Sequence, residues 1–246
     1  RRGIEMTTEI ELREQLATCA RIMAMQGLLG LHGHISVFQP ETQRMLISPG
    51  AGSDKANLCA DDMVVAGLDG KAVDGKRPPL EWPIHTAIHA ARADALAIAH
   101  LHPPHATLFS ISKREYKPVT MHSGVFGKGI GVYREAHLIT STDRGERLRQ
   151  ALGDKRAAFQ RAHGITVVAR NIPEMLHITL CLENDALKTL QAASLGEVGT
   201  LSAEEVALLE KEITLEMVAP RTWTYFSTLE ARWDRQPGSG LSPLFP

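Results

Sequence analysis

The stretch Ala95-Leu-Ala-Ile-Ala-His-Leu-His-Pro-Pro104 joins an unbroken apolar run to two histidines and a proline pair. The run predicts a buried strand, and the two prolines predict where it ends. Because side chains two residues apart in a strand point to the same side, His100 and His102 are expected to leave one face together. Two imidazoles placed in this way form half of a metal site, so other parts of the chain are expected to supply the rest.

Helical and strand-like patterns alternate on both sides of this stretch. Helices are predicted over residues 7–29, 81–92, 106–112, 143–152, 173–195, 202–218 and 222–233. Strands are predicted over 32–38, 45–48, 63–68, 95–102 and 157–169, the last interrupted at His163-Gly164, while 119–132 fits strand or loop. The mixture predicts one α/β domain over residues 1–246, with a mixed sheet, helices on both faces and a helical, aromatic C-terminal extension from about residue 203.

The composition is that of an ordinary globular protein. The 246 residues are 43% hydrophobic and 22% charged, with a net charge of -1, which gives no reason to expect a nucleic-acid or anionic-membrane partner. No apolar run approaches the ~18 residues of a membrane span, and the start, Arg1–Met6, lacks the apolar stretch of a secretory signal. Three cysteines without paired spacing (Cys19, Cys59 and Cys181) favour a reducing compartment, so a cytoplasmic location is predicted.

Two further residues are candidates to complete the metal site. His163 precedes a glycine at a predicted strand break, where a side chain can leave the sheet. Glu81 opens a helix, where the dipole favours a carboxylate, and it is a candidate fourth ligand or a proton donor and acceptor. Three imidazoles with one open position are typical of catalytic rather than structural metal sites. The alternative is that these residues are scattered polar side chains near loops.

His85 and His89 compete with this assignment. With Glu81 they form an i, i+4, i+8 row on one helix face, and a metal pair at this spacing is chemically reasonable. The favoured interpretation is that both are partly buried helix residues that face the sheet. His177, within an apolar helical segment, is predicted to be a core histidine with satisfied hydrogen bonds.

Five segments together resemble one known family. They are His32-Gly-His-Ile-Ser-Val37, Leu46-Ile-Ser-Pro-Gly50, Glu81-Trp-Pro-Ile-His85, Ala99-His-Leu-His-Pro103 and Ala162-His-Gly164. Over about residues 11–210 the chain resembles the class II aldolase/adducin family. The resemblance implies a three-layer α/β/α sandwich with a mainly antiparallel sheet, and a homotetramer with active sites at subunit contacts. It also implies that His100, His102 and His163 bind one divalent metal ion per subunit, with Glu81 as an acid/base that can also touch the metal.

The sequence departs from the sugar-phosphate aldolases of that family at three places. Gly33-His-Ile-Ser36 stands where they usually read Gly-Asn-x-Ser, Ser48-Pro-Gly-Ala51 where they usually read Thr-Pro-Ser/Thr-Gly, and Pro79-Leu80 replaces a serine pair. These changes remove donors that would form charge-assisted hydrogen bonds to a phosphate. The Gly-His-x-Ser form resembles the decarboxylase branch, whose members act on hydroxylated aromatic or pyridine carboxylates and dicarboxylates, including one of vitamin B6 breakdown.

The resemblance implies a metal-dependent decarboxylase in which Mn or Zn, with Fe or Co also compatible, stabilises an enolate-like intermediate. Glu81 is the expected proton relay. His34 is expected either to fix a substrate carboxylate or to be a hydrogen-bonded turn residue. Tyr133 lies near the position of a phenol that reaches a neighbouring subunit's site in aldolases, and a catalytic role for it is a minority expectation.

Ser36, Ser48 and Gly50 are the candidate substrate-binding positions. The alternative is that the two serines serve backbone turns. Two other functions stay open at this point: an aldolase or epimerase acting on a sugar phosphate or sugar acid, and a non-catalytic adducin-like interaction module. The module is disfavoured because it would be expected to lose the metal histidines. In either enzymatic case the expected partners are a small-molecule substrate and further copies of the chain.

Overall fold

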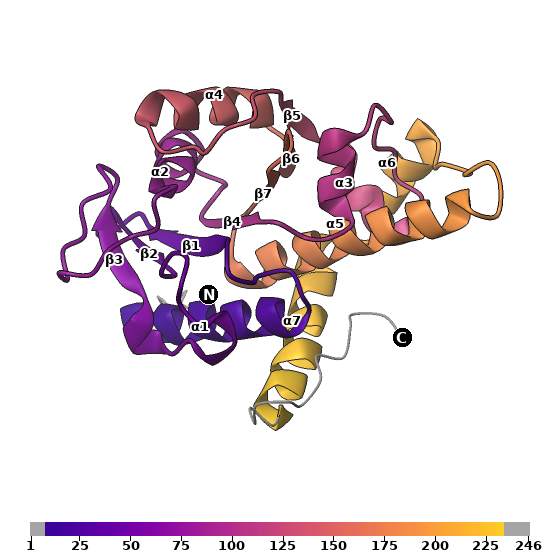
Figure 1. The fold of residues 1–246 in the computed structure, drawn as a ribbon. Coiled ribbons are helices and arrows are strands. Elements are labelled where there is room, and N and C mark those ends of the chain that lie inside the picture. The colour runs from indigo at the N-terminus through magenta and orange to yellow at the C-terminus, as the bar shows by residue number, and fades with distance from the viewer. Residues whose placement is uncertain (1–7, 234–246) are drawn as a thin grey trace.

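A seven-stranded sheet in the order β3-β2-β1-β4-β7-β6-β5 forms the centre of the protein. The computed structural model describes residues 8–233 (Figure 1). The strands are β1 (His34–Gln39), β2 (Arg44–Ile47), β3 (Val64–Gly67), β4 (Ala97–Leu101), β5 (Gly131–Tyr133), β6 (Ala157–Gln160) and β7 (Gly164–Ala169). Only β5 and β6 pair in parallel, and the other five neighbouring pairs are antiparallel. The predicted mixed, mainly antiparallel sheet is confirmed.

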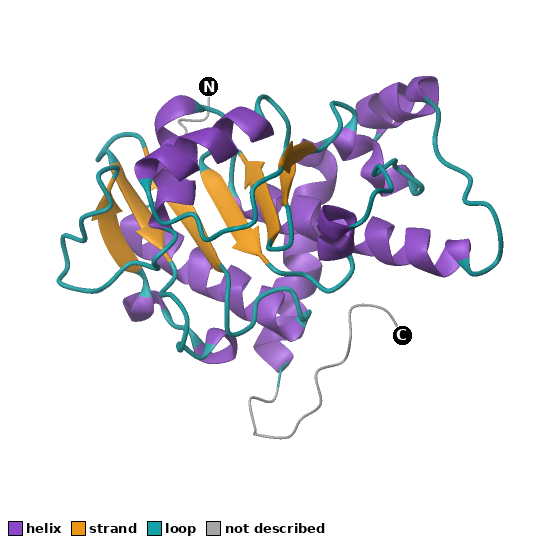
Figure 2. Cartoon of the chain, turned by 45° about the horizontal axis from the view of Figure 1, so that its top comes forward, coloured by secondary structure: helices purple, strands orange, loops and turns teal. Residues whose placement is uncertain are grey.

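Helices cover both faces of this sheet (Figures 1 and 2). They are α1 (Glu9–Met25), α2 (Trp82–Ala91), α3 (Ala106–Ile111), α4 (Thr142–Leu152), α5 (Ile172–Ala193), α6 (Ala203–Glu212) and α7 (Leu215–Arg232). One apolar core joins α1 and α5 to one face of the sheet, and a second joins α2 and α4 to the other. This arrangement is the predicted α/β/α sandwich.

The alternation of side chains along β4 assigns its residues to these two cores. Ala97, Ala99 and Leu101 belong to the α1/α5 core, whereas Ile98 belongs to the α2/α4 core. His100 is two residues from Ile98, so it faces α2. Strand β1 follows the same rule, because Ile35 and Val37 lie in the α1/α5 core. The side chains at positions 34, 36 and 38 therefore point toward α2.

Several local predictions need correction. His163 does not interrupt a single strand: β6 and β7 form an antiparallel hairpin, and His163 lies in its turn. The open segment 119–132 contains a 3-10 helix, η3 (Met121–Phe126), before β5. The last helix starts at Leu215, not near 222, and contains Pro220 in its interior. Helix α6 begins with a capping box formed by Ser202 and Glu205.

The described part of the chain begins at Thr8 and ends at Trp233. Arg1–Met6, Thr7 and the residues after Trp233 lie outside the described part. Between residues 8 and 233, no helix combines the length and the apolar character needed to cross a bilayer.

Candidate metal centre

Four predicted residues meet at one end of the central strands. His100 is the penultimate residue of β4, His102 follows that strand directly, His163 lies in the β6–β7 turn and Glu81 is the N-cap of α2. Single ligand atoms of the three histidines all lie within 4.8 Å of one another. The three rings meet at close to right angles, with interplanar angles of 81°, 69° and 66°. The structure thus brings together all four residues that the sequence proposed as ligands.

The distances within this cluster fit the edges of a tetrahedron around one ion. Nε2 of His100 lies 3.2 Å from Nε2 of His102, and Glu81 Oε2 lies 3.5 Å from His100 Nε2 and 3.4 Å from His163 Nε2. With bond lengths of ~2.0–2.1 Å, two ligands of a tetrahedral zinc ion are ~3.3 Å apart. Both ring nitrogens of His163 are buried and lack a hydrogen-bond partner within residues 8–233. A bound divalent ion would satisfy such a nitrogen, so the donor set fits a metal.

The electrostatics keep the cluster in the protonation states that a metal needs. Burial alone would raise the pKa of Glu81, but the rings of His100 and His163 and the Ile139 N–H outweigh it and lower that pKa. Burial lowers the pKa of His100, and burial together with His100 lowers the pKa of His102 to about 3. At neutral pH the cluster therefore sets an ionised Glu81 carboxylate beside neutral imidazoles at His100 and His102.

Backbone contacts hold these side chains in place. The Nδ1 atom of His100 lies 3.1 Å from the carbonyl oxygen of Ile165, and Glu81 Oε1 accepts a hydrogen bond from Ile139 N at 2.7 Å. Gly164 packs closely against Leu101 and the His102 ring. A Cβ at position 164 would lie 2.3 Å from Leu101 O and 2.6 Å from His102 Cδ2. Such contacts to the far side of a ligand fix its orientation.

His34 lies beside the cluster, as predicted. It pairs with His100 in the β1–β4 register, and one of its ring nitrogens lies within 4.8 Å of ligand atoms of Glu81 and His100. Its Nδ1 is 2.7 Å from His85 Nε2. His85 and His89 lie on the sheet side of α2 as predicted, but they are fully rather than partly buried. His177 is likewise a buried histidine with partners on both ring nitrogens.

The proposed substrate-binding serines are occupied by other contacts. Ser36 is fully buried, and its hydroxyl lies 2.6 Å from His85 Nδ1 and 2.9 Å from His89 Nε2. Ser48 Oγ is also fully buried and accepts from Ile35 N at 3.0 Å. Both hydroxyls therefore face the interior, Ser48 against the backbone and Ser36 against two histidines, and a contact of either serine with substrate stays a prediction.

Gly50 and Tyr133 occupy different surroundings. Gly50 packs against Pro79, where a Cβ would meet the Pro79 Cα at 3.1 Å. Tyr133 is buried in the α2/α4 core, and its hydroxyl lies 3.4 Å from His137 Nε2. No contact links Tyr133 to the histidine cluster of the same chain among the described residues, so its contribution to a neighbouring subunit's site stays a prediction.

One charged residue near the site, Lys55, was not predicted from the sequence. Lys55 is 3% exposed, and its amine donates to the carbonyl oxygens of Pro49 and Gly50. Burial lowers its pKa to about 8, and its charge contributes to lowering the pKa of His34. It lies in a loop of small and polar residues with no motif, and only its burial distinguishes it from a surface lysine.

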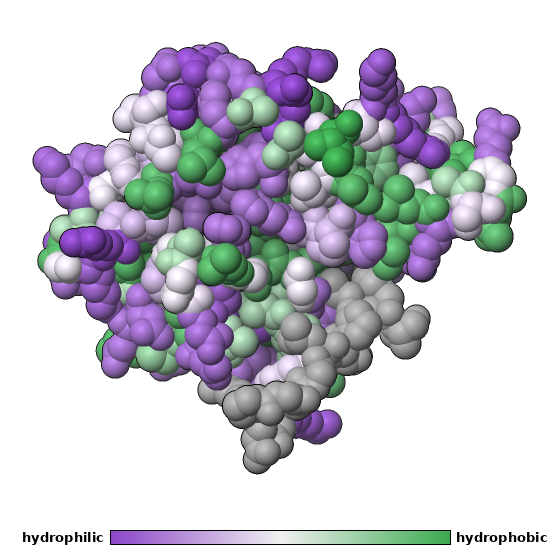
Figure 3. All heavy atoms as spheres, in the orientation of Figure 1, coloured by the Kyte–Doolittle hydropathy of each residue, from purple (hydrophilic) through white to green (hydrophobic). Residues whose placement is uncertain are grey.

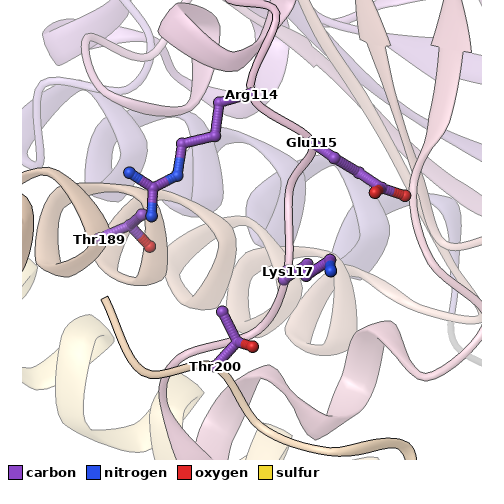
Figure 4. A pocket seen from close by; sticks show the side chains of 5 residues that line it. All are labelled: Arg114, Glu115, Lys117, Thr189 and Thr200. Atoms are coloured by element: carbon purple, nitrogen blue, oxygen red, sulfur yellow. The ribbon is translucent and has the colours of Figure 1, made fainter. Parts of the chain in front are cut away.

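Two other hollows are separate from the cluster. A small cavity of about 270 Å³ is lined by Arg114, Glu115, Lys117, Thr189 and Thr200; in Figure 4 the Arg114 side chain extends toward Thr189 of α5, and Glu115 points the other way. A larger groove of about 1070 Å³ carries six cationic side chains and one carboxylate. The groove reaches Arg161 and Ala162, the residues just before His163.

The sequence and the fold are both similar to those of known proteins. Residues 14–189 match the family described as "Class II Aldolase and Adducin N-terminal domain". The chain is 35% identical to a 3,4-dihydroxyphthalate decarboxylase of Rhodococcus jostii (strain RHA1), over 79% of this chain and 85% of that protein. It is 30% identical to an L-fuculose phosphate aldolase of Escherichia coli (strain K12), over 81% and 92%.

Solved structures agree with this relationship. An L-fuculose 1-phosphate aldolase superposes with a TM-score of 0.75 at 27% identity, covering 82% of this chain and 95% of that one. An aldolase II superfamily protein from Pseudomonas syringae shares the fold at a TM-score of 0.82 and 24% identity, covering 94% and 96%. The named relatives are lyases that act on small molecules, and the chain belongs to the class II aldolase and adducin family.

Proposed function

We propose that this protein is a metal-dependent decarboxylase of a hydroxylated aromatic or pyridine dicarboxylate. The observation that carries the proposal is the convergence of His100, His102, His163 and Glu81, with a histidine at position 34 beside them. The 35% sequence identity between this chain and a 3,4-dihydroxyphthalate decarboxylase supports the proposal. The fuculose phosphate aldolase relatives make aldol cleavage the competing reaction.

The three histidines would hold the ion, and Glu81 Oε2 would fill the fourth position only while no substrate is bound, which leaves Glu81 free to act on the substrate. A divalent ion, Mn or Zn with Fe or Co also suited to these donors, would supply Lewis-acid stabilisation of the negative charge that develops on a substrate oxygen. The protein fixes the donors at the end of β4, in the β6–β7 turn and at the N-terminus of α2 before any substrate arrives. Such a preorganised site does not reorganise during the reaction.

Glu81 is the proposed proton relay. Its carboxylate takes the proton of a hydroxyl that lies ortho to the departing carboxylate. The ring–carboxylate C–C bond then breaks, its electron pair stays with the ring, and carbon dioxide leaves. Glu81 returns the proton to the ring carbon, and the phenolate product takes one proton from water. The lowered pKa of Glu81 means that this carboxylate is ionised before the first step and is able to accept a proton.

The loop at residues 48–50 disfavours a phosphorylated substrate. The Ser48 hydroxyl accepts a hydrogen bond from Ile35 N. The Gly50 carbonyl oxygen accepts one from Lys55. A phosphate dianion needs several donors in one place. The groove that reaches Arg161 and Ala162 carries an excess of cations, which would attract a dicarboxylate.

We also propose that copies of the chain assemble into a homotetramer with sites at subunit contacts. Support comes from the exposed apolar surface in the region of α3, α5 and α6, visible as green patches in Figure 3. Apolar side chains exposed on or just after these helices include Ile111, Leu195 and Leu208. Contiguous apolar surface of this kind marks interaction sites. Sedimentation velocity would test the subunit number.

Carbon dioxide release tests the chemical proposal. Protein reconstituted separately with Mn and Zn is given a panel of hydroxypyridine and dihydroxybenzene dicarboxylates, with fuculose and ribulose phosphates as aldol controls. Release from an ortho-hydroxy dicarboxylate, abolished by Glu81→Gln and retained by Glu135→Gln at an exposed carboxylate, supports the decarboxylase. Aldehyde formed from a sugar phosphate, with no carbon dioxide from the panel, would establish the aldolase instead.

A further inference from the structure

A buried chain of hydrogen bonds leads from the metal cluster into the protein interior. His34 Nδ1 lies 2.7 Å from His85 Nε2, and His85 Nδ1 lies 2.6 Å from Ser36 Oγ. Ser36 Oγ lies 2.9 Å from His89 Nε2, and His89 Nδ1 lies 2.8 Å from the carbonyl oxygen of Ala95. All four side chains are at least 95% buried, so water does not compete for these contacts.

At the His89 end of this series of hydrogen bonds, only one arrangement of protons is consistent with the contacts. The carbonyl oxygen of Ala95 can only accept, so Nδ1 of His89 carries a proton. Burial lowers the pKa of His89 to about 4, and the groups that face its ring are Ser36, the Ala95 carbonyl, Phe38 and His85, none of them acidic. A neutral His89 with its proton on Nδ1 has a lone pair on Nε2. The hydroxyl of Ser36 must therefore donate to it.

The remaining links follow one by one. Ser36 has a single proton and gives it to His89, so Ser36 Oγ accepts from His85 Nδ1. Burial also lowers the pKa of His85, so this ring is neutral and its Nε2 accepts. His34 Nδ1 must then be the donor to His85. The reversed order of protons would set a nitrogen lone pair against the Ala95 carbonyl oxygen at 2.8 Å.

We propose that His85, Ser36 and His89 are positioning residues that hold the proton of His34 on Nδ1 and so present its bare Nε2 to the metal cluster. The Ala95 carbonyl oxygen, at the other end of this series of hydrogen bonds, determines the tautomer of His34. Because Nδ1 is engaged by His85, Nε2 is the nitrogen left for the site. His34 then offers an acceptor there, which suits a substrate hydroxyl or a bound water and disfavours a carboxylate or phosphate oxygen.

This assignment differs from the sequence expectation that His34 fixes a substrate carboxylate. A carboxylate would meet a lone pair at Nε2, not an N–H. The tautomer is a property of the resting protein and does not depend on the proposed reaction. Only the choice of a hydroxyl-bearing substrate at this position rests on the proposed function.

Nuclear magnetic resonance of protein labelled with ¹⁵N at histidine tests the tautomer directly. Two-bond nitrogen–proton correlations distinguish a ring with its proton on Nδ1 from one with its proton on Nε2. The metal-free wild type at neutral pH is expected to show His34, His85 and His89 all with the proton on Nδ1, which is the minority form of free histidine. Loss of one set of signals in each single His→Gln variant assigns the rings. An Nε2–H pattern for His34 in the wild type would overturn the proposal.

Variants at Ser36 separate positioning from mere packing. In Ser36→Ala, His85 Nδ1 loses its acceptor, so the proton of His85 is expected to move to Nε2 and that of His34 to leave Nδ1 for its own Nε2. Ser36→Thr keeps the hydroxyl and is expected to keep the wild-type pattern. An unchanged His34 signal in a folded Ser36→Ala protein would contradict the relay. These signals are read without substrate, so a failed decarboxylase assay leaves this test intact.

Discussion

The Nδ1 atom of His100 lies 3.1 Å from the carbonyl oxygen of Ile165, and this contact determines what His100 offers to His102. A carbonyl oxygen only accepts, so Nδ1 carries the proton and Nε2 is left with a lone pair. That lone pair points at His102 Nε2, 3.2 Å away. One shared ion would satisfy both nitrogens at once, so the lone pair of His100 is already oriented for metal binding.

Removing one imidazole from the cluster should abolish tight metal binding. In His102→Ala and His163→Ala the donor set falls from four to three, and two histidines with one carboxylate bind a zinc-like ion more weakly. We expect at least the ~10–100-fold loss of affinity seen when only an outer contact of a metal ligand is removed. Titration calorimetry with Zn and Mn measures it. His122→Ala, at an exposed histidine, is the matched control, and equal affinities in all three would remove these residues from the site.

Glu81→Gln should leave the fold intact and stop the chemistry. The amide keeps the size of the side chain and an oxygen for Ile139 N, but it cannot take or return a proton. Loss of general acid–base catalysis typically costs ~10²–10⁴-fold in rate. Turnover of the active dicarboxylate, with melting temperature measured in parallel, checks this. Full activity of Glu81→Gln would exclude Glu81 as the relay.

Gly164→Ala should disturb the cluster from outside it. The new methyl group would meet the Leu101 carbonyl oxygen at 2.3 Å and the His102 ring at 2.6 Å, so one of them must move. Overpacking of this kind typically costs about 1–3 kcal/mol of unfolding free energy, and the displaced ring should bind metal less tightly. Gly199→Ala, where nothing lies within 4 Å of the new atom, is the control. Urea unfolding and metal titration should separate the two variants.

The metal-free protein should lose stability as the pH falls from 7.5 to 5.5. His89 has a folded-state pKa of about 4 against an ordinary 6.5, so the unfolded chain binds the extra proton and stability drops as the pH passes below 6.5. The loss is about 1 kcal/mol for such a histidine over this interval. His34 and His85 act in the same direction.

The unfolding free energy of His89→Phe at the two pH values tests how much of the predicted loss of stability comes from His89 alone. This variant removes the titrating group and should flatten the fall in unfolding free energy by about 1 kcal/mol. It also breaks the contact with Ala95, so its stability at pH 7.5 is expected to be lower from the start. Urea midpoints at the two pH values measure both effects, and an unchanged slope would show that His89 does not titrate on unfolding.

The sequence allowed the cluster to be predicted because each of its members carries a local signal. The apolar run before His100, the proline pair after His102, the glycine after His163 and the helix start at Glu81 are all readable without tertiary structure. The resemblance to a family then joined them. The sheet and its flanking helices followed from the same local patterns.

The roles of Ser36 and Lys55 could not be predicted in this way. Ser36 matters because β1 packs against α2 so that its hydroxyl falls between two helix histidines, and no local pattern encodes that contact. Lys55 looks like a surface residue until the loop folds over its amine. The start of α7 was missed because Pro220 suggests a break, whereas packing of Leu215 and Ala219 extends the helix across it.

The sheet order has a consequence for how the protein acquires its ion. His100 lies in β4 and His163 lies in the β6–β7 turn, while Glu81 is the N-cap of α2 on one face of the sheet, so these donors converge only after the sheet and α2 have packed together. Unlike a zinc finger, whose metal is needed for folding, this chain should mature in two stages, folding first and loading later. A chelator should then yield a folded, inactive apoprotein that regains its ion without a chaperone.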